Sequence, residues 1–215
     1  MKNFGYQRVY NRFFKRIIDF FAALFLLIAA LPVLAVISVV IIIDSGFPVF
    51  YKPLRAGYKN KSFRIYKFRT MVKDADKGDG TTALNDPRIT RAGKILRKLK
   101  LDEIPQLINV LNSTMSFIGP RPELLRYTDQ YKNEEKLILE VRPGITDFSS
   151  IEFINLDEIV GEENPDEMYE KYVLKQKNEL RVKYAKEVSL KTDVSLFVKT
   201  CLQVVKKAIR ILGKK

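Results

Sequence analysis

Two adjacent carboxylates, Asp102 and Glu103, are the strongest candidates for chemistry in the sequence. The chain contains no histidine, which excludes the usual imidazole base and leaves Asp, Glu, Lys, Tyr and Cys for proton and group transfer. In such a pair, one carboxylate can attack phosphorus while its neighbour helps to hold a hard cation such as Mg²⁺ against phosphate oxygens. Taken alone, the pair is explained more simply as a cap on the following helix, worth about 0.3 to 1 kcal/mol.

Basic side chains in rigid or extended segments are candidates for binding phosphate. Arg121 stands between Pro120 and Pro122, each of which restricts its own φ and biases the preceding residue toward extended geometry. A guanidinium presented in this way suits a diphosphate, although a turn with an exposed arginine explains the same segment. The other candidate phosphate-binding residues are Lys67, Arg69, Arg88 and Arg142.

Short secondary-structure elements must position these groups. Apolar and basic residues alternate over residues 63–68, which is typical of a strand with one buried face. Apolar spacing predicts a helix that ends near Leu101, and Pro105 stands at the first turn of another. The acidic pair therefore falls at the junction of the two helices. Residues 74–86 are expected to form a surface loop, either a lid or merely solvated, and residues 165–184 are helix-prone.

Length and charge limit the architecture and the partners. A chain of 215 residues with 47% hydrophobic residues suits one domain with an attachment, and the order of elements predicts a mainly helical α+β fold with a small sheet. The net charge of +13 calls for an anionic partner, which could be nucleic acid, a lipid surface or a phosphorylated substrate. The single Cys201 cannot close an internal disulfide, which fits a cytosol-facing body.

An uncharged, apolar run over residues 20–43 is long enough to cross a hydrocarbon layer of roughly 30 Å as a helix. Pro32 lies in the middle of this run and predicts a kink. Lysines and arginines flank the run on both sides, and the positive-inside rule keeps both flanks in the cytoplasm only if the chain enters, bends and returns. From the residues alone, a re-entrant hairpin and an ordinary spanning anchor both remain open. We place the anchor at residues 1–48 and the catalytic domain at residues 49–215.

The C-terminal segment, residues 197–212, is the second candidate membrane element. Its apolar stripe consists of Phe197, Cys201, Val204, Val205, Ala208, Ile211 and Leu212. Four basic residues lie off the stripe, so an amphipathic helix could rest in the headgroup zone of an anionic leaflet. A helix that packs on the core with a solvated basic face explains the same pattern.

Several long motifs in order resemble one family. They are Arg55-Ala56-Gly57, Tyr66-Lys67-Phe68-Arg69-Thr70-Met71, Leu101-Asp102-Glu103-Ile104-Pro105-Gln106-Leu107-Ile108-Asn109-Val110-Leu111 and Met115-Ser116-Phe117-Ile118-Gly119-Pro120-Arg121-Pro122. Together they are similar to the bacterial sugar transferases called small monotopic phosphoglycosyl transferases. The resemblance runs from about Lys15 to the terminal helix and is densest between Arg55 and Gly144.

The resemblance implies a covalent mechanism. Asp102 would attack the β-phosphate of a UDP-sugar, release UMP and hold the phosphosugar until undecaprenyl phosphate accepts it. Glu103, with Asp102, would place Mg²⁺, and Lys67 and Arg121 match cationic positions around the phosphates. The resemblance also implies a re-entrant helix bent at Pro32.

That topology would place a small catalytic domain on the cytoplasmic face of the bacterial inner membrane. The expected partners are a UDP-sugar, a polyprenyl phosphate and membrane phospholipids, with a homodimer as a further expectation. The product would enter the assembly of a capsule, O-antigen, exopolysaccharide or glycoprotein glycan.

This sequence departs from the family pattern at three places. Leu31 precedes Pro32 where better-known members carry a serine, which bears on the detail of the bend. The segment Asp147-Phe148-Ser149-Ser150 replaces a Gly-Leu continuation and puts sugar selectivity in doubt. Arg181 stands where some relatives carry an acidic residue, and we assign it no role in the site.

Three other functions are compatible with parts of the sequence. A non-enzymatic membrane scaffold could bind anionic lipid through its basic face, with the acidic pair serving only as helix caps. A lipid-phosphate hydrolase would use similar groups but release free phosphate or sugar phosphate. Binding of nucleic acid is disfavoured, because the cations cluster beside an apolar anchor and no familiar nucleic-acid motif or tryptophan is present.

Overall fold

The computed structural model describes residues 1–215 except 1–3, 74, 76–85, 155, 162–163 and 213–215. The α-helices are α1 (Lys15–Ser45), α2 (Arg91–Lys98), α3 (Gln106–Leu111), α4 (Leu125–Thr128), α5 (Phe148–Glu152), α6 (Leu156–Val160), α7 (Pro165–Met168), α8 (Lys175–Glu187) and α9 (Leu190–Leu212). Shorter 3-10 or π-helical turns occupy Gly5–Gln7, Tyr10–Phe14, Tyr58–Asn60, Leu101–Glu103, Asn133–Glu140 and Tyr169–Leu174. The chain is thus mainly helical, as predicted.

The β structure consists of short two-stranded pairs. Strand β1 (Phe50–Tyr51) pairs antiparallel with β4 (Lys67–Phe68), and β2 (Leu54–Ala56) pairs antiparallel with β3 (Ser62–Arg64). Strands β5 (Ser116–Ile118) and β6 (Gly144–Thr146) form a parallel pair, with Ser116 opposite Gly144. This last pair brings two segments far apart in the sequence together beneath α8 and α9.

The strand predicted at residues 63–68 is interrupted, which corrects the sequence-based expectation. Residues 65 and 66 lie between β3 and β4, and the pairing partner changes from β2 to β1 across this gap. The backbone N–H of Tyr66 donates to Asn109 Oδ1 at 2.8 Å instead of to a neighbouring strand. The side-chain amide of Asn109 on α3 therefore takes the hydrogen bond of Tyr66 between the end of the β2–β3 pairing and the start of the β1–β4 pairing.

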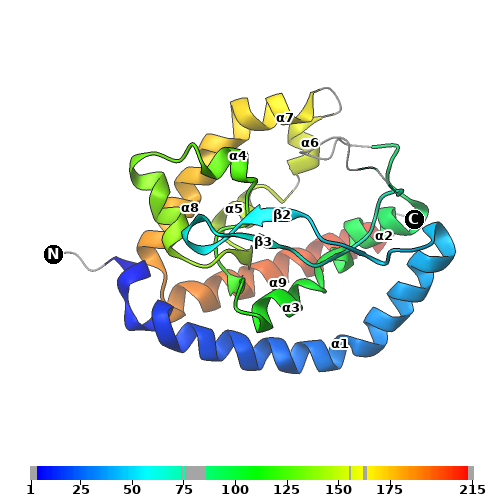
Figure 1. Ribbon diagram of the computed structural model, residues 1–215, viewed down its shortest axis with the longest axis horizontal. Helices are drawn as coiled ribbons and strands as arrows, with labels where there is room; N and C mark the ends of the chain where they lie inside the picture. Colours follow the sequence, from blue (N-terminus) through cyan, green and yellow to red (C-terminus); the bar gives the residue numbers. More distant parts are fainter. Residues whose placement is uncertain (1–3, 74, 76–85, 155, 162–163, 213–215) are drawn as a thin grey trace.

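Helix α1 forms one continuous helix that includes Pro32 and bends along its length, turning upward at the right of Figure 1. The helical stretch Tyr10–Ser45 is long and apolar enough to cross a membrane, by length and composition. Ala23, Ile37 and Ile41 are buried against the rest of the molecule, whereas most of the other large apolar side chains of α1 are exposed. The bend agrees with the expected kink, while the re-entrant topology stays a prediction.

Polar contacts attach both ends of α1 to the remainder of the chain. Near its start, Lys15 forms a buried ion pair with Asp193 of α9. Near its end, Asp44 Oδ2 accepts a hydrogen bond from the backbone N–H of Ala92 in α2 at 3.1 Å. Arg69, which follows β4, donates to the carbonyl of Ser45, the last residue of α1, at 2.7 Å and to that of the C-cap Gly46 at 2.6 Å. The helix is thus fixed to the same body at two distant points.

Apolar clusters show how α1 supports the centre of the molecule. The first half of α1 contributes Ala23 to a cluster with Leu107 and Val110 of α3. The second half contributes Ile37 and Ile41 to a cluster with Leu96 of α2 and Phe68 of β4. The two helices predicted to flank the acidic pair therefore both pack on α1.

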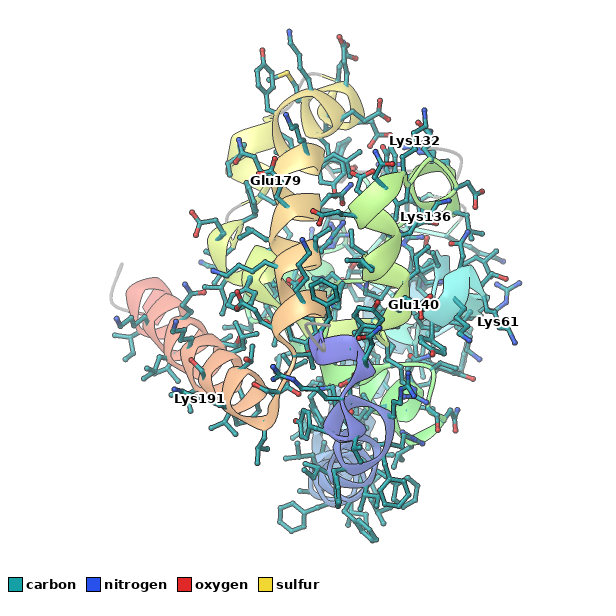
Figure 2. All side chains as sticks on the ribbon, turned by 90° about the vertical axis from the view of Figure 1, so that its left-hand side faces the viewer. Lys61, Lys132, Lys136, Glu140, Glu179 and Lys191 are labelled. Atoms are coloured by element: carbon teal, nitrogen blue, oxygen red, sulfur yellow. The ribbon has the colours of Figure 1, made fainter. Side chains whose placement is uncertain are left out.

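The predicted C-terminal helix is present as α9, which runs behind α3 in Figure 1. Of the predicted apolar stripe, Phe197, Cys201, Val204 and Val205 are exposed, and the side chains of the remaining members lie outside the described residues. Further exposed apolar residues on α9 are Leu190, Val194, Val198, Leu202 and Ile209. Figure 2 places Lys191 on α9 at the lower left, far from the charged side chains Lys61, Lys132 and Lys136. The position of α9 in the headgroup zone stays a prediction.

The loop predicted at residues 74–86 lies almost entirely outside the described residues.

Candidate active site

The acidic pair lies in a tight connection between α2 and α3, as predicted. Lys100 has a φ of 58°, in the left-handed region that residues other than glycine rarely adopt, and it turns the chain out of α2. The 3-10 turn Leu101–Glu103 follows, and Pro105 stands at the N-cap of α3. Asp102 is 8% exposed, so this short turn presents a carboxyl group within the protein rather than to bulk water.

Glu103 is neutralised by two cations from distant segments. Arg121 donates to both carboxylate oxygens, from Nη1 to Oε2 at 2.9 Å and from Nη2 to Oε1 at 2.6 Å. Lys67 Nζ lies 3.3 Å from Oε1. Burial raises the pKa of Glu103, but the Arg121 and Lys67 charges outweigh burial and hold the pKa well below its usual range. The predicted residues Glu103, Arg121 and Lys67 are therefore brought together as one ionised cluster.

Arg121 is held on its backbone and on its side chain. Its Nη1 also donates to the carbonyl of Ile145 at 2.6 Å, and the N–H of Gly144 donates to the carbonyl of Pro120 at 3.0 Å. Asp147 is completely buried, caps the N-terminus of α5 and lies with Oδ2 3.4 Å from the Arg121 backbone nitrogen. Asp147, at which the sequence departs from the family pattern, thus caps α5 and also contacts the backbone of Arg121.

The two proline residues beside Arg121 differ in exposure. Pro120 is buried and Pro122 is half-buried. The β5–β6 approach next to them is so close that a Cβ on Gly144 would lie 2.1 Å from the backbone nitrogen of Gly119. Glycine at this position lets the two backbones meet and so fixes where the proline-flanked arginine emerges.

Asp102 differs from Glu103 because its Oδ1 is buried and has no hydrogen-bond partner among the described residues. Burial raises the pKa of Asp102; the Lys67 charge lowers it, and the Glu103 charge raises it. Burial also lowers the pKa of Lys67, an effect that the Glu103 charge opposes. The pair therefore divides into one carboxylate that holds the cations and one with a buried oxygen that lacks a hydrogen-bond partner among the described residues.

The other three predicted phosphate-binding residues make their contacts elsewhere. Arg69 caps the C-terminus of α1. Arg88 pairs with Asp86 at 2.6 Å. Arg142 Nε donates to the carbonyl of Ser113 at 3.2 Å. These contacts give each residue a structural partner, and phosphate binding by them stays a prediction.

Sequence reasoning missed Asn109 as a positioning residue. Its Nδ2 donates to the carbonyl of Arg64 at 2.8 Å, and its Oδ1 accepts from the N–H of Tyr66 at 2.8 Å. These bonds join α3 to the segment that leads into Lys67. A buried amide among the apolar residues of α3 was a signal for such a role, because a buried polar group needs partners.

Mg²⁺ is compatible with the donor set at the acidic pair. Within the described part of the chain, no group of three or more Asp, Glu, Cys or His residues could hold a metal ion. Mg²⁺ commonly binds through one or two carboxylates together with substrate phosphates and waters, so an all-protein cage is not required. The unpartnered Oδ1 of Asp102 fits one such ligand position, whereas both Glu103 oxygens contact cations.

An apolar helix long enough to cross a membrane by length and composition, and a carboxylate oxygen without a partner among the described residues next to two cations, are compatible with a membrane-associated group-transfer enzyme. The family model described as bacterial sugar transferase matches residues 10–207. The chain belongs to this family and is a phosphoglycosyl transferase.

Curated relatives agree with this assignment. The chain is 40% identical over 137 residues to an uncharacterized sugar transferase, EpsL, of Bacillus subtilis, covering 64% of this chain and 67% of that protein. It is 44% identical over 121 residues to a putative undecaprenyl-phosphate N-acetylgalactosaminyl 1-phosphate transferase of the same organism, covering 56% and 68%. It is 39% identical over 145 residues to the UDP-glucose:undecaprenyl-phosphate glucose-1-phosphate transferase of Escherichia coli, covering 66% of this chain and 31% of that protein.

Proposed function

We propose that this protein transfers a phosphosugar from a UDP-sugar to undecaprenyl phosphate through a covalent intermediate on Asp102. The products are a polyprenyl diphosphate-sugar and UMP. The observation that carries the proposal is the contrast within the acidic pair. Both oxygens of Glu103 contact cations, whereas Asp102 Oδ1 is buried and has no hydrogen-bond partner in the described part of the chain. The names of the relatives, which include transferases acting on undecaprenyl phosphate, support the choice of acceptor.

The first half-reaction forms a bond between an Asp102 carboxylate oxygen and the β-phosphorus of the UDP-sugar. The bond between the β-phosphorus and the oxygen that joins it to the α-phosphorus breaks, and its electron pair leaves with UMP. Lys67 and Arg121 lie where they can offset the charge that gathers on the phosphoryl oxygens and on the leaving group. Their contacts with Glu103 hold both cations beside the nucleophile before any substrate binds.

The second half-reaction regenerates the enzyme. An oxygen of the lipid phosphate attacks the same phosphorus, the Asp102–phosphorus bond breaks, and its electron pair returns to the carboxylate. Mg²⁺, with the unpartnered Asp102 oxygen as one ligand and phosphate oxygens and waters as others, would supply charge neutralisation when bound. Glu103 would serve as a second ligand only by exchanging one of its contacts with Arg121 or Lys67 for the metal. Neither half-reaction requires a histidine or a net proton transfer at the protein.

The attachments of α1 support a re-entrant topology. A helix that crossed the bilayer would carry its ends to opposite faces of a hydrocarbon layer roughly 30 Å thick. Here Lys15 near one end contacts α9, and Asp44 near the other contacts α2, so both ends lie against one body. With basic flanks on both sides, this arrangement favours a catalytic domain on the cytoplasmic face of the inner membrane.

Release of UMP from a panel of UDP-sugars tests the function. The purified protein in lipid nanodiscs is assayed with and without undecaprenyl phosphate and Mg²⁺. We expect sustained UMP release from at least one donor only when the carrier is present, and loss of release on chelation of the metal. Release of inorganic phosphate or free sugar phosphate instead of a lipid-linked product would indicate a hydrolase. Absence of UMP with every donor would contradict the proposal.

A further inference from the structure

The two helices that flank the acidic pair are each held by a charged side chain of α1. Asp44 Oδ2 accepts from the backbone N–H of Ala92, in the first turn of α2, at 3.1 Å. Arg16 donates to the carbonyls of Val110 and Leu111, at the end of α3, at 2.7 and 2.9 Å. These contacts come from opposite ends of α1 and reach the far ends of the two flanking helices.

The signs of the two charges suit the helix ends that they contact. The first backbone N–H groups of a helix and its last carbonyls have no partner within the helix, and they carry partial positive and negative charge respectively. An acidic side chain meets the start of α2, and a basic side chain meets the end of α3. Asp44 satisfies the free N–H of Ala92, and Arg16 reaches the carbonyl of Leu111 as well as that of Val110, which also accepts from the N–H of Ser113 at 3.1 Å. Each charge also opposes the partial charge of the helix end that it contacts.

Packing adds to these polar contacts. Ala23 of α1 is completely buried in the cluster that includes Leu107 and Val110 of α3. Ile41 of α1 is 1% exposed in the cluster that includes Leu96 of α2. The turn that carries Asp102 and Glu103 thus lies between α2 and α3, and both of these short helices pack on the long helix α1.

We propose that Asp44 and Arg16 are positioning residues for the transferase, through which α1 sets the geometry of the Asp102–Glu103 turn. The membrane helix then has a second role besides anchoring, because its conformation fixes how far apart α2 and α3 lie. This inference rests on the proposed function, since its test measures the same reaction.

The test compares UMP release by the full chain in nanodiscs for Asp44→Ala and Arg16→Met. Because misplacement of a catalytic group by about 1 Å can cost on the order of 100-fold in rate, we expect each variant to lower kcat by at least about 10-fold. The KM for the UDP-sugar should change by less than about 2-fold, because the hydrogen bonds of Asp44 and Arg16 go to the backbones of α2 and α3 and not to Lys67 or Arg121. The midpoint of thermal unfolding should fall by no more than a few degrees, because each variant removes one helix-end contact, and the protein should remain folded and retained in the nanodisc at the assay temperature.

Two further variants make the comparison specific. Asp44→Asn keeps an oxygen that can accept from the Ala92 N–H, and it should recover most of the kcat that Asp44→Ala loses. Ser38→Ala removes a hydroxyl of α1 that donates to the carbonyl of Leu34 at 2.7 Å, within the same helix, and it should behave as wild type. An Asp44→Asn variant as impaired as Asp44→Ala would contradict positioning through this hydrogen bond.

The remaining outcomes separate this inference from the proposed function. Wild-type kcat in both Asp44→Ala and Arg16→Met would overturn the inference and leave the function standing. Loss of folded protein, or a fall in activity that follows only a raised KM, would assign the two contacts to stability or binding and would also overturn it. Absence of UMP release from the wild type itself would instead refute the proposed function.

Discussion

Two partly buried acid–arginine pairs in this molecule, Glu103–Arg121 and Glu123–Arg181, are alike in chemistry and different in their surroundings. In the second pair, Arg181 Nη1 lies 3.1 Å from Glu123 Oε2, and the hydroxyl of Tyr169 donates to the same oxygen at 2.6 Å. Arg181 is 2% exposed. Both pairs hold the pKa of the glutamate below its usual range, since the arginine charge outweighs the effect of burial.

The neighbours of the two pairs decide what each can do. Beside Glu103 lies Asp102, whose Oδ1 has no partner among the described residues. Beside Glu123, the N–H of Leu124 donates to the remaining carboxylate oxygen at 3.2 Å, so both oxygens are engaged within the protein. The second pair also contains a buried atom without a hydrogen-bond partner among the described residues, Arg181 Nε, but that atom belongs to the paired cation itself. The comparison teaches that an ion pair by itself does not mark an active site; what distinguishes the first pair is a second carboxylate beside it with an unpartnered oxygen.

Asp102→Asn should have the largest effect on activity. The amide cannot act as the nucleophile, so we expect turnover to fall by at least about 1,000-fold, as measured by UMP release. The folded state should not suffer, because the pKa of Asp102 is raised by burial and the carboxylate is costly to keep charged there. Thermal unfolding should therefore be unchanged or shifted slightly upward. A variant that retains more than a few per cent of activity would be inconsistent with a covalent role.

Glu103→Gln should be the next most severe. It removes the charge that holds Arg121 and Lys67, and loss of one preorganised electrostatic contact typically costs about 100- to 1,000-fold in rate. Steady-state kinetics should show the loss mainly in kcat. Activity close to wild type would mean that the cations need no partner to stay in place.

Arg181→Leu should show the opposite balance between stability and activity. It leaves Glu123 buried without its cation, and breaking a buried pair in this way typically costs about 3 to 5 kcal/mol. Thermal unfolding should shift strongly downward, while the protein that remains folded should keep kcat within a few-fold of wild type. If activity were lost with no change in unfolding, Arg181 would belong to the site after all.

The pH dependence of the first half-reaction should report the ionisation of Asp102. Because burial raises its pKa, the carboxylate is protonated at a higher pH than an ordinary aspartate, and the rate should fall as pH drops through that raised value. Glu103, with its pKa held well below the usual range, should not titrate in the same window. A rate that is flat to pH values near the ordinary aspartate pKa would place the nucleophile elsewhere.

The free energy of unfolding should also depend on pH through Glu123, and it should decrease as the pH falls. Its folded pKa is depressed, so the pair contributes stability above the ordinary pKa of glutamate and loses it as pH falls through the lowered value. Thermal unfolding of wild type and Arg181→Leu should therefore converge in acid. Persistent separation of the two curves at low pH would argue that packing, rather than charge, carries the Arg181 contribution.

Local features of the site could be predicted from sequence, because they depend on nearby residues. The position of the acidic pair between two helices follows from apolar spacing before Leu101 and from Pro105. The Glu103–Arg121 contact could not be derived in the same way, since it depends on the parallel pairing of β5 and β6 and on the Asp147 cap. The flanking prolines indicate Arg121 as a candidate for binding phosphate, and the family resemblance agrees, but neither predicts its contact with Glu103.

Long-range contacts also explain the remaining differences. The predicted strand at 63–68 is interrupted because Asn109 of α3 takes the hydrogen bond of Tyr66. Arg69 was grouped with the phosphate-binding cations, yet its position after β4 brings it to the end of α1. Both facts depend on how α1 and α3 pack against the strands, which no local pattern in the sequence specifies.

The covalent intermediate on Asp102 is the central claim, and intact-mass measurement tests it most directly. The purified protein is mixed with its UDP-sugar and Mg²⁺ in the absence of undecaprenyl phosphate, and the mass of the intact chain is then measured by mass spectrometry. We predict a species heavier by one phosphosugar, formed with one equivalent of UMP, lost on addition of the lipid phosphate and absent in Asp102→Asn. An active enzyme whose mass never changes, or an adduct that persists in Asp102→Asn, would contradict the account.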